Sequence, residues 1–243
     1  MATRLSDALP HGLRYEPTPK WVRAELEGET VIDSRRAILV WEPDHVVPGY
    51  AFPREDVDFG KLPDDAVKGY EDEDLAGLVG VAWNAVDRWI EEDEEVVGHA
   101  RDPFKRIDVR ESSRHVVVRI DGEVVADTRR PRLLFETHLP VRYYIPPADV
   151  RTELLSPSDR KTVCAYKGHA SHLTATISDR EHEHVAWTYP DPLTDADPVR
   201  DLIAFYNERV DIEVDGEIEE RPTTQWSPGH EDEARRVLPR GVA

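Results

Sequence analysis

Three glycines, Gly28, Gly122 and Gly216, follow one another at intervals of 94 residues, and each sits in the same local setting. The surrounding segments are Trp21-Val-Arg-Ala-Glu-Leu-Glu-Gly-Glu29, His115-Val-Val-Val-Arg-Ile-Asp-Gly-Glu123 and Arg209-Val-Asp-Ile-Glu-Val-Asp-Gly-Glu217. A repeat of this length indicates one fold written twice. We therefore expect two domains of about 100 residues, each large enough to bury its own core.

The alignment between the two halves extends well beyond these glycines. Residues 20–42 match residues 114–136, and the match resumes further along the chain. The identical or aligned pairs are Val22/Val116, Gly28/Gly122, Glu29/Glu123, Val31/Val125, Asp33/Asp127, Arg35/Arg129, Arg36/Arg130, Leu39/Leu133, Glu42/Glu136, Tyr50/Tyr143, Pro53/Pro146, Asp56/Asp149, Val57/Val150, Ala82-Trp83/Ala186-Trp187 and residues 106–109/209–212. Because each Arg-Arg pair is duplicated, we expect at least one arginine of each pair to be structural.

The repeat predicts an N-terminal extension (1–20), a first, shortened domain (21–109), a second, complete domain (110–217) and a C-terminal tail (218–243). The first domain lacks the piece that holds residues 164–168 in the second. Its nearest counterpart, residues 67–69, is too short to establish equivalence. The tail is rich in Glu, Arg and Pro, and we expect it either to be disordered or to be strapped across the surface by Trp226.

Hydrophobic periodicity predicts mainly strands. Alternation over residues 116–120, the turn dipeptide Asp121-Gly122 and a second run over residues 124–126 indicate a hairpin. Further extended runs cover 132–136, 142–145, 162–166, 172–177 and 184–188, with a turn at 178–181. Helices are expected at 85–95, with Asn84 as N-cap, and at 198–206, with Asp197 as N-cap. The predicted fold is mainly β, with two tandem copies of a small antiparallel fold and one short helix per copy.

The charge of the chain argues against nucleic-acid partners. Fifty acidic residues against 31 basic ones give a formal net charge of −19, and such a field repels phosphate backbones. No apolar run follows Met1, so we expect neither a signal peptide nor a membrane span, and a cytoplasmic protein. The single cysteine excludes intramolecular disulfides and a cysteine-based zinc site. The sequence predicts no cofactor and leaves the oligomeric state open.

Several motifs of the second half occur in the order seen in a known family. They are residues 129–137, 140–146, 164–168, 186–191 and 204–211. Together they resemble the bacterial family of unknown function DUF427, and the arrangement is similar to that of its tandem two-domain members. The resemblance implies a compact β fold of the Mss4-like or β-tent kind. Members of that wider group often hold zinc with four cysteines, which this chain lacks, and the resemblance implies no activity.

The candidate site combines aromatic side chains with cations and one carboxylate. Arginine clamps carboxylates or phosphates, and tyrosine offers a positioned hydroxyl, so such a set suits a small anionic or planar ligand. The predicted residues are Arg129, Glu136, Arg142, Tyr144, Tyr166, Lys167, Trp187 and Tyr189. The competing interpretation is structural: the aromatic residues border the core, and Glu136 pairs with an arginine.

Cysteine and histidine chemistry is the weaker alternative. On an alternating strand, Cys164 lies on the face opposite to Lys167 and His169, so we expect a small buried apolar residue and not a nucleophile. His169 and His172 are three residues apart and point to opposite faces. His182 and His184 share a face at a charged hairpin end, where the ligand set is incomplete, so no metal site is predicted.

Two function classes follow. The first is a cytoplasmic protein whose second domain binds a small anionic or aromatic ligand, while the shortened first domain packs as a buttress. The alternative is a non-catalytic protein-interaction module. Whether chemistry follows binding is open; if it does, Tyr144 or Tyr166 is the expected acid–base group, and Arg142 or Lys167 stabilises negative charge. A redox role for Cys164 ranks third.

Overall fold

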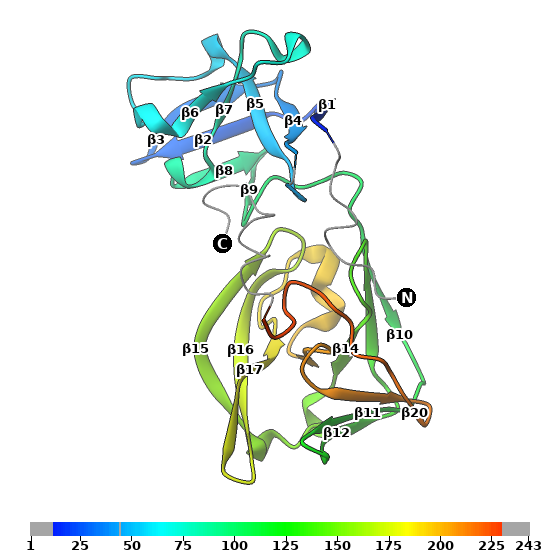
Figure 1. Cartoon of the computed structure of the whole chain (residues 1–243). Coiled ribbons are helices and arrows are strands. Elements are labelled where there is room, and N and C mark those ends of the chain that lie inside the picture. Colours follow the sequence, from blue (N-terminus) through cyan, green and yellow to red (C-terminus); the bar gives the residue numbers. More distant parts are fainter. Residues whose placement is uncertain (1–11, 44, 230–243) are drawn as a thin grey trace. The chain divides into compact units, whose positions relative to one another are not determined.

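The computed structural model describes residues 12–43 and 45–229, and these form two compact units that divide between Asp102 and Pro103 (Figure 1). Each unit contains one large and one small antiparallel sheet. The mainly β class is therefore confirmed, whereas the Mss4-like shape implied by the resemblance stays a prediction. No helix of the described residues is long and apolar enough to cross a lipid bilayer.

The first unit has a five-stranded and a four-stranded sheet. The order in the larger sheet is β1 (Arg14–Pro17), β4 (Ile38–Trp41), β5 (Gly49–Pro53), β7 (Leu78–Val81) and β6 (Val67–Gly69). The smaller sheet has the order β3 (Glu29–Ser34), β2 (Val22–Leu26), β8 (Arg88–Glu91) and β9 (Glu94–Val96). The buried cluster that includes Val22, Ile32, Phe52 and Trp89 draws side chains from both sheets, so the core lies between them.

The second unit repeats this plan with a larger sheet. Its seven strands are ordered β10 (Ile107–Glu111), β13 (Arg132–Glu136), β14 (Arg142–Ile145), β18 (Ile203–Phe205), β17 (Arg180–Thr188), β16 (Gly168–Ile177) and β15 (Leu155–Cys164). The four-stranded sheet is β12 (Glu123–Thr128), β11 (Val116–Ile120), β19 (Asp211–Val214) and β20 (Glu217–Ile218). Val118, Ile145, Phe205 and Ile212 belong to one core cluster, which again joins both sheets.

The strand orders fix the correspondence between the units. β1, β4, β5 and β7 occupy the places of β10, β13, β14 and β18, and the β8–β9 hairpin occupies that of β19–β20. The sequence matches of 106–109 with 209–212 and of Ala82-Trp83 with Ala186-Trp187 are therefore wrong. Ala82-Trp83 lies at the start of a 3₁₀ turn whereas Ala186-Trp187 lies in β17, and residues 106–109 run into β10 whereas 209–212 run into β19. Where the second unit has β17, β16 and β15, the first has only the three residues of β6.

One ion pair recurs at the same place in each unit. Arg36 Nη2 lies 2.7 Å from Asp56 Oδ1, and Arg130 Nε lies 2.9 Å from Asp149 Oδ2. Each aspartate closes a short 3₁₀ turn, η2 (Arg54–Asp56) or η6 (Pro147–Asp149), against the preceding hairpin. The prediction that one arginine of each Arg-Arg pair is structural is confirmed.

The expected helix at 85–95 is wrong, because this segment forms the β8–β9 hairpin. The Val86, Trp89, Ile90 spacing fits a helix face, but Trp89 and Ile90 are both buried with β8 paired to β2. Glu92 adopts a φ of 52° and turns the chain back. Tertiary pairing here overrides the helical pattern.

The expected helix at 198–206 is also wrong. A 3₁₀ helix, η8 (Thr194–Val199), contains Pro198, and Asp201 then adopts a φ of 59°. The following Ile203–Phe205 pairs with both β14 and β17, and its side chains are fully buried. Strand pairing in the middle of the sheet leaves no room for a helix.

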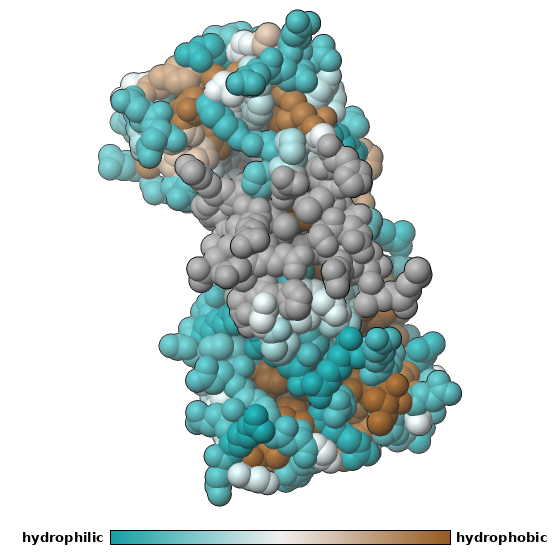
Figure 2. Space-filling model, viewed as in Figure 1, coloured by the Kyte–Doolittle hydropathy of each residue, from teal (hydrophilic) through white to brown (hydrophobic). Residues whose placement is uncertain are grey.

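The structure describes the tail up to Gly229, and this part packs against the second unit. Of the two expected alternatives, it is the strapped one. Thr224 and Ser227 are buried, and the Trp226 ring lies 6.3 Å from the Tyr206 ring. In Figure 1 this orange-to-red segment lies with the strands of the second unit. Residues 230–243 of the predicted tail and 1–11 of the predicted extension lie outside the described residues. The visible surface is mainly hydrophilic, with smaller apolar patches (Figure 2).

We predict that Gly28→Ala destabilises the first unit by about 1 kcal/mol. Gly28 has a backbone φ of +78°, which residues other than glycine adopt only with strain. No atom lies within 4 Å of an added Cβ, so strain is the only cost. Urea unfolding measures the change. Gly49→Ala is the control, since that site is equally open and has no positive φ; an equal loss in both variants contradicts the prediction.

Candidate functional site

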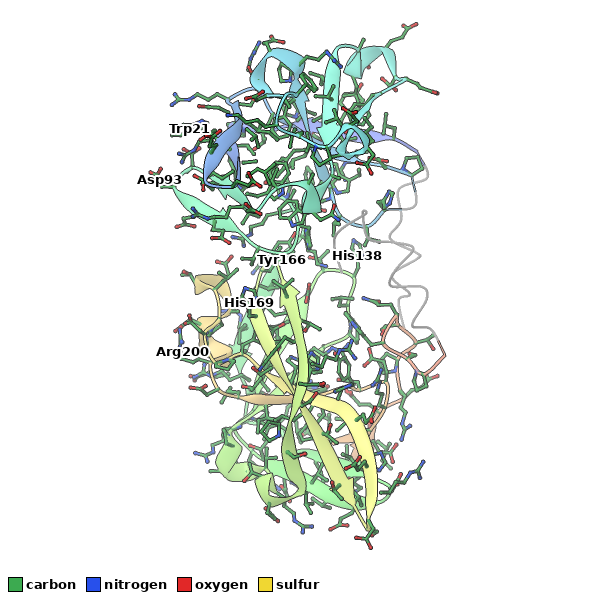
Figure 3. All side chains as sticks on the ribbon, turned by 90° about the vertical axis from the view of Figure 1, so that its left-hand side faces the viewer. Trp21, Asp93, His138, Tyr166, His169 and Arg200 are labelled. Carbon is green, nitrogen blue, oxygen red and sulfur yellow. The ribbon has the colours of Figure 1, made fainter. Side chains whose placement is uncertain are left out.

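The seven-stranded sheet carries the candidate residues on the face that points away from the inter-sheet core. A second apolar cluster lies there, and it includes Leu134, Tyr144, Ala170, Trp187 and Tyr206. One polar cluster borders it near the β15–β16 turn and two more near the strap. Tyr166 and His169 mark the β15–β16 turn in Figure 3.

The first polar cluster is a buried carboxylate between two lysines, here named the lysine–glutamate cluster. Glu136, the last residue of β13, accepts a hydrogen bond of 2.5 Å from Lys167 Nζ, which comes from the β15–β16 turn. Lys105 Nζ lies 3.1 Å from the other carboxylate oxygen, and its ammonium lies 5.7 Å from the Tyr166 ring centroid. The Glu136 side chain is 5% exposed and that of Lys167 10%, so both charges are withdrawn from solvent.

The pKa values of the groups in and next to this cluster are shifted away from neutral pH. Burial alone would raise the pKa of Glu136, but Lys167 and Lys105 outweigh it and lower the pKa to about 2. Burial lowers the pKa of Lys167, yet the neighbouring Cys164, Glu136 and Tyr189 bring it well above its ordinary value. Burial raises the pKa of Tyr144 to about 12. Near pH 7, Glu136 and Lys167 are therefore charged and Tyr144 keeps its hydroxyl proton. Groups in such fixed states suit electrostatic stabilisation better than proton transfer.

The same ion pair exists in the first unit. Glu42, the counterpart of Glu136, accepts a hydrogen bond from Lys68 Nζ, and the Lys68 ammonium lies 5.7 Å from the Tyr70 ring centroid. The Lys68 side chain is 51% exposed there. The short segment 67–69 is thus the functional counterpart of the Lys167 turn, and only the second unit buries the pair.

Cys164 and Lys167 do not follow the predicted alternation. β15 ends at Cys164, and residues 165–167 form a turn, so the two side chains are no longer related by strand periodicity. The charge interaction between them is strong enough to raise the pKa of Lys167. Cys164 is half-buried, so it is less enclosed than the small buried residue that was predicted.

The second polar cluster is built around Arg142, the first residue of β14. Its guanidinium donates two hydrogen bonds of 2.7 Å to the Glu208 carboxylate and one of 3.1 Å to Asn207. Thr224 of the strap donates to the same carboxylate at 2.6 Å. Burial would raise the pKa of Glu208, but these bonds hold it below its ordinary value. Arg142 is engaged by Glu208 and Asn207, and through Glu208 it links β14 to the strap.

The third polar cluster surrounds His172, a fully buried residue of β16. Its Nε2 lies 2.9 Å from the Thr162 hydroxyl, while its Nδ1 is buried and has no hydrogen-bond partner among the described residues. The Tyr206 ring stacks on the imidazole, with centroids 6.2 Å apart and planes at 12°. Burial, followed by the charges of Arg160, His184, Arg209 and Lys161, lowers the pKa of His172 to about 4.

The structure brings most of the predicted residues together. Glu136 and Lys167 pair, with Tyr144 and Tyr189 close enough for their pKa values to respond to Lys167. Trp187 joins them to the Arg142 cluster, because its Nε1 donates to the Tyr144 hydroxyl at 3.1 Å while Arg142 lies 5.6 Å from its ring. Tyr166 lies under Lys105.

Arg129 does not join this group. Its guanidinium lies 3.3 Å from His115 Nδ1, at the start of the four-stranded sheet. Sequence reasoning also missed residues that complete the clusters, namely Lys105, Arg160, Tyr206, Glu208, Arg209 and Trp226. The run 204–211 contains three of them, Tyr206, Glu208 and Arg209. This mixture of an acid, a base and a tyrosine in one short run was the available signal.

The described histidines of the β16–β17 hairpin lie apart from one another's partners. No group of three or more His, Cys, Asp or Glu side chains within the described ranges is arranged to hold a metal ion. His182 and His184 do not share a face, because a bulge interrupts the β16–β17 pairing and His184 has a φ of 53°. His184 Nδ1 lies 2.6 Å from the Ser158 hydroxyl, whereas His182 lies 3.2 Å from Asp121.

Comparisons with known proteins give one family. The family described as a domain of unknown function, DUF427, matches residues 14–71 and 108–216. The match falls on both units and leaves a gap between them. A search of curated proteins returned no significant match.

We predict that Glu136→Gln destabilises the second unit by about 3 kcal/mol, because it leaves the Lys167 ammonium buried without its counter-charge. Urea unfolding of the full chain measures the loss. Glu153→Gln is the control, since that carboxylate is 63% exposed in its pair with Arg151 and is expected to change stability by less than about 0.5 kcal/mol. Equal effects of the two substitutions contradict a buried ion pair.

The same pair makes stability depend on pH below neutral. The pKa of Glu136 is about 2 in the folded chain and about 4.3 in an unfolded one, so its contribution is complete above about pH 5 and declines as the pH falls towards 2. The difference in unfolding free energy between the parent chain and Glu136→Gln should therefore shrink across this window. A difference that stays constant from pH 5 to pH 2 contradicts the lowered pKa.

Proposed function

The chain belongs to the DUF427 family, whose function is unknown, and from its geometry we propose that the second unit binds a small anion beside His172. The ligand class is a molecule that carries a phosphate or a carboxylate. The proposal keeps the small anionic ligand expected from the sequence, but it moves the recognising residues from Arg142 to Arg160 and Arg209. A cytoplasmic location fits a metabolite ligand and stays a prediction.

The charge around His172 carries the proposal. Besides burial, the groups that lower the pKa of His172 are the basic residues Arg160, His184, Arg209 and Lys161. Among the described residues, neither Arg160 nor Arg209 has a carboxylate within ion-pair distance, although the chain has 50 acidic residues and 31 basic ones. Glu208, next to Arg209 in the sequence, is engaged by Arg142. Basic groups gathered around one buried imidazole repel one another, and a bound anion would relieve that repulsion.

The polar groups near His172 are also incomplete without a ligand. The buried Nδ1 has no partner among residues 12–43 and 45–229, and a buried polar atom in that state destabilises a fold. Arg160 and Arg209 are half-buried, so their guanidinium groups reach solvent at the border of the cluster. Guanidinium groups bind carboxylates and phosphates through paired hydrogen bonds.

Aromatic side chains form the rest of the proposed site. Tyr206 lies between the His172 ring and the Trp226 ring, and the Arg209 guanidinium lies 5.1 Å from its centroid. Trp187 approaches Tyr206 at 4.5 Å from the other side. This wall is held by the Arg142–Glu208 pair and the strap, so the site is preorganised by the interactions that saturate Arg142.

The test is an NMR titration of His172 in the full chain, with and without inorganic phosphate. A bound anion favours the imidazolium form, so the pKa of His172 should rise from about 4 towards its ordinary value of about 6.5. Arg160→Ala and Arg209→Ala should each weaken phosphate binding about tenfold, since each removes a charged hydrogen-bond donor worth ~1.5 kcal/mol.

Arg129→Ala is the matched control, because among the described residues the side chain of this arginine forms a hydrogen bond with His115 alone. It should leave phosphate affinity unchanged. An unshifted His172 pKa at saturating phosphate and citrate, or an equal loss of affinity in all three arginine variants, contradicts a specific anion site.

A further inference from the structure

A second site lies at the opposite face of the seven-stranded sheet, at the end of the inter-sheet core. It is an open pocket of about 300 Å³. Its floor is apolar and comes from β13, β14 and the segment before β14, whereas its border is charged and comes from β10 and the segment that follows it. The lining residues are Arg110, Glu111, Ser112, Arg114, Leu133, Phe135, Val141 and Tyr143.

The most unusual wall residue is Phe135, which is 43% exposed although it lies in a strand of the larger sheet. Leu133, on the same face of β13, is 6% exposed and belongs to the core. The Tyr143 hydroxyl is held by Glu219 at 2.7 Å, which fixes the adjacent wall. A large side chain is therefore kept at the surface by a rigid surround.

The first unit shows what covers this position in the other copy. Trp41 occupies the place of Phe135 and is only 3% exposed. The chain that follows the β8–β9 hairpin covers it: Ala100 is fully buried in the same cluster, and Trp41 Nε1 donates to Asp102 at 3.2 Å. A chain segment with a small apolar residue and a carboxylate two residues later thus closes the pocket in the first unit.

In the second unit the corresponding chain takes another course. After β20, Arg221 pairs with Asp211 and Thr224 bonds to Glu208, so the strap crosses to the His172 face. Among residues 12–43 and 45–229, the Phe135 pocket has no equivalent of the segment that closes its counterpart. Asp108 of β10 is the residue paired with Phe135 of β13. At the same position in the first unit, Arg14 of β1 is paired with Trp41, and its guanidinium lies 4.6 Å from the Trp41 ring centroid.

We propose that the Phe135 pocket binds a short extended segment of a partner protein, with a large apolar side chain next to a carboxylate. The apolar side chain contacts Phe135, Leu133 and Val141. The carboxylate pairs with Arg114, whose side chain is 57% exposed and whose nearest acid, Asp215, lies at 3.9 Å. Arg110 is already paired with Asp108 at 2.9 Å and Glu111 with Arg132 at 2.8 Å, so Arg114 is the border cation with only a distant acid. A negatively charged segment is therefore the complementary one.

The experiment uses the full chain and the N-acetylated, C-amidated peptide Glu-Asp-Phe-Asp-Glu, with affinity measured by calorimetry. Replacing the peptide phenylalanine by alanine should weaken binding about tenfold, and Phe135→Ala should do the same, because each removes one side of the apolar contact. Arg114→Ala should weaken the acidic peptide several-fold and leave the neutral Gln-Asn-Phe-Asn-Gln peptide unchanged. Ile218→Ala, at a residue that is 70% exposed in β20 outside the pocket, is the control.

Equal affinity for the phenylalanine and alanine peptides, or full affinity in Phe135→Ala, overturns the proposal. N-acetylphenylalaninamide binding as tightly as the acidic peptide would also overturn it, since the pocket would then take a small molecule. Arg160→Ala and Arg209→Ala should leave peptide binding unchanged, so the outcome is independent of the anion site beside His172.

Discussion

Pairing between the first and the last hairpin of a unit closes each half of this protein. β2 pairs with β8 in the first unit, and β11 pairs with β19 in the second, although nearly the whole unit lies between the partners along the chain. This pairing builds the four-stranded sheet and covers one face of the larger sheet with a dry core. β1 and β10 precede the first hairpin of their units, and the strap follows the last one of the second unit; the remaining strands are inserted between the hairpins and enlarge the other sheet.

The second face of the larger sheet distinguishes the two units. In the first, Val40, Ala51 and Leu75 cover it with a small apolar cluster, and the Glu42–Lys68 pair stays partly exposed. In the second, the long strands β15 to β17 extend the sheet, and Tyr144 stands where the first unit has Ala51. The wider face buries the Glu136–Lys167 pair, and burial strengthens the interaction because water no longer screens it. The ion pair is therefore partly exposed in the unit with the short insertion and internal in the unit with the long one.

The repeat and the turn chemistry made much of this fold predictable. The Asp121-Gly122 dipeptide predicted the β11–β12 hairpin, and alternation predicted most strands of the second unit. Prediction was wrong where local and tertiary preferences differ: Trp89 and Ile90 fit a helix face, but pairing with β2 buries both. It was also wrong where a strand ended unseen, as at Cys164. The eight proposed site residues were mostly brought together, but their partners were not predicted, since Glu208 and Lys105 reach them only through the fold.

The distribution of charge separates structural from recognising residues. Arg142 and Lys167 satisfied the sequence criteria for ligand contacts, yet each is paired with a buried carboxylate, Glu208 or Glu136. Arg160 and Arg209 have no such partner in the part of the chain that the structure describes, and both lower the pKa of an imidazole with an unsatisfied nitrogen. Arginines without an internal carboxylate are the better candidates for pairing with an anionic ligand. We therefore place the proposed recognition on the arginines beside the strap, while Arg142 beneath it keeps their aromatic wall in place.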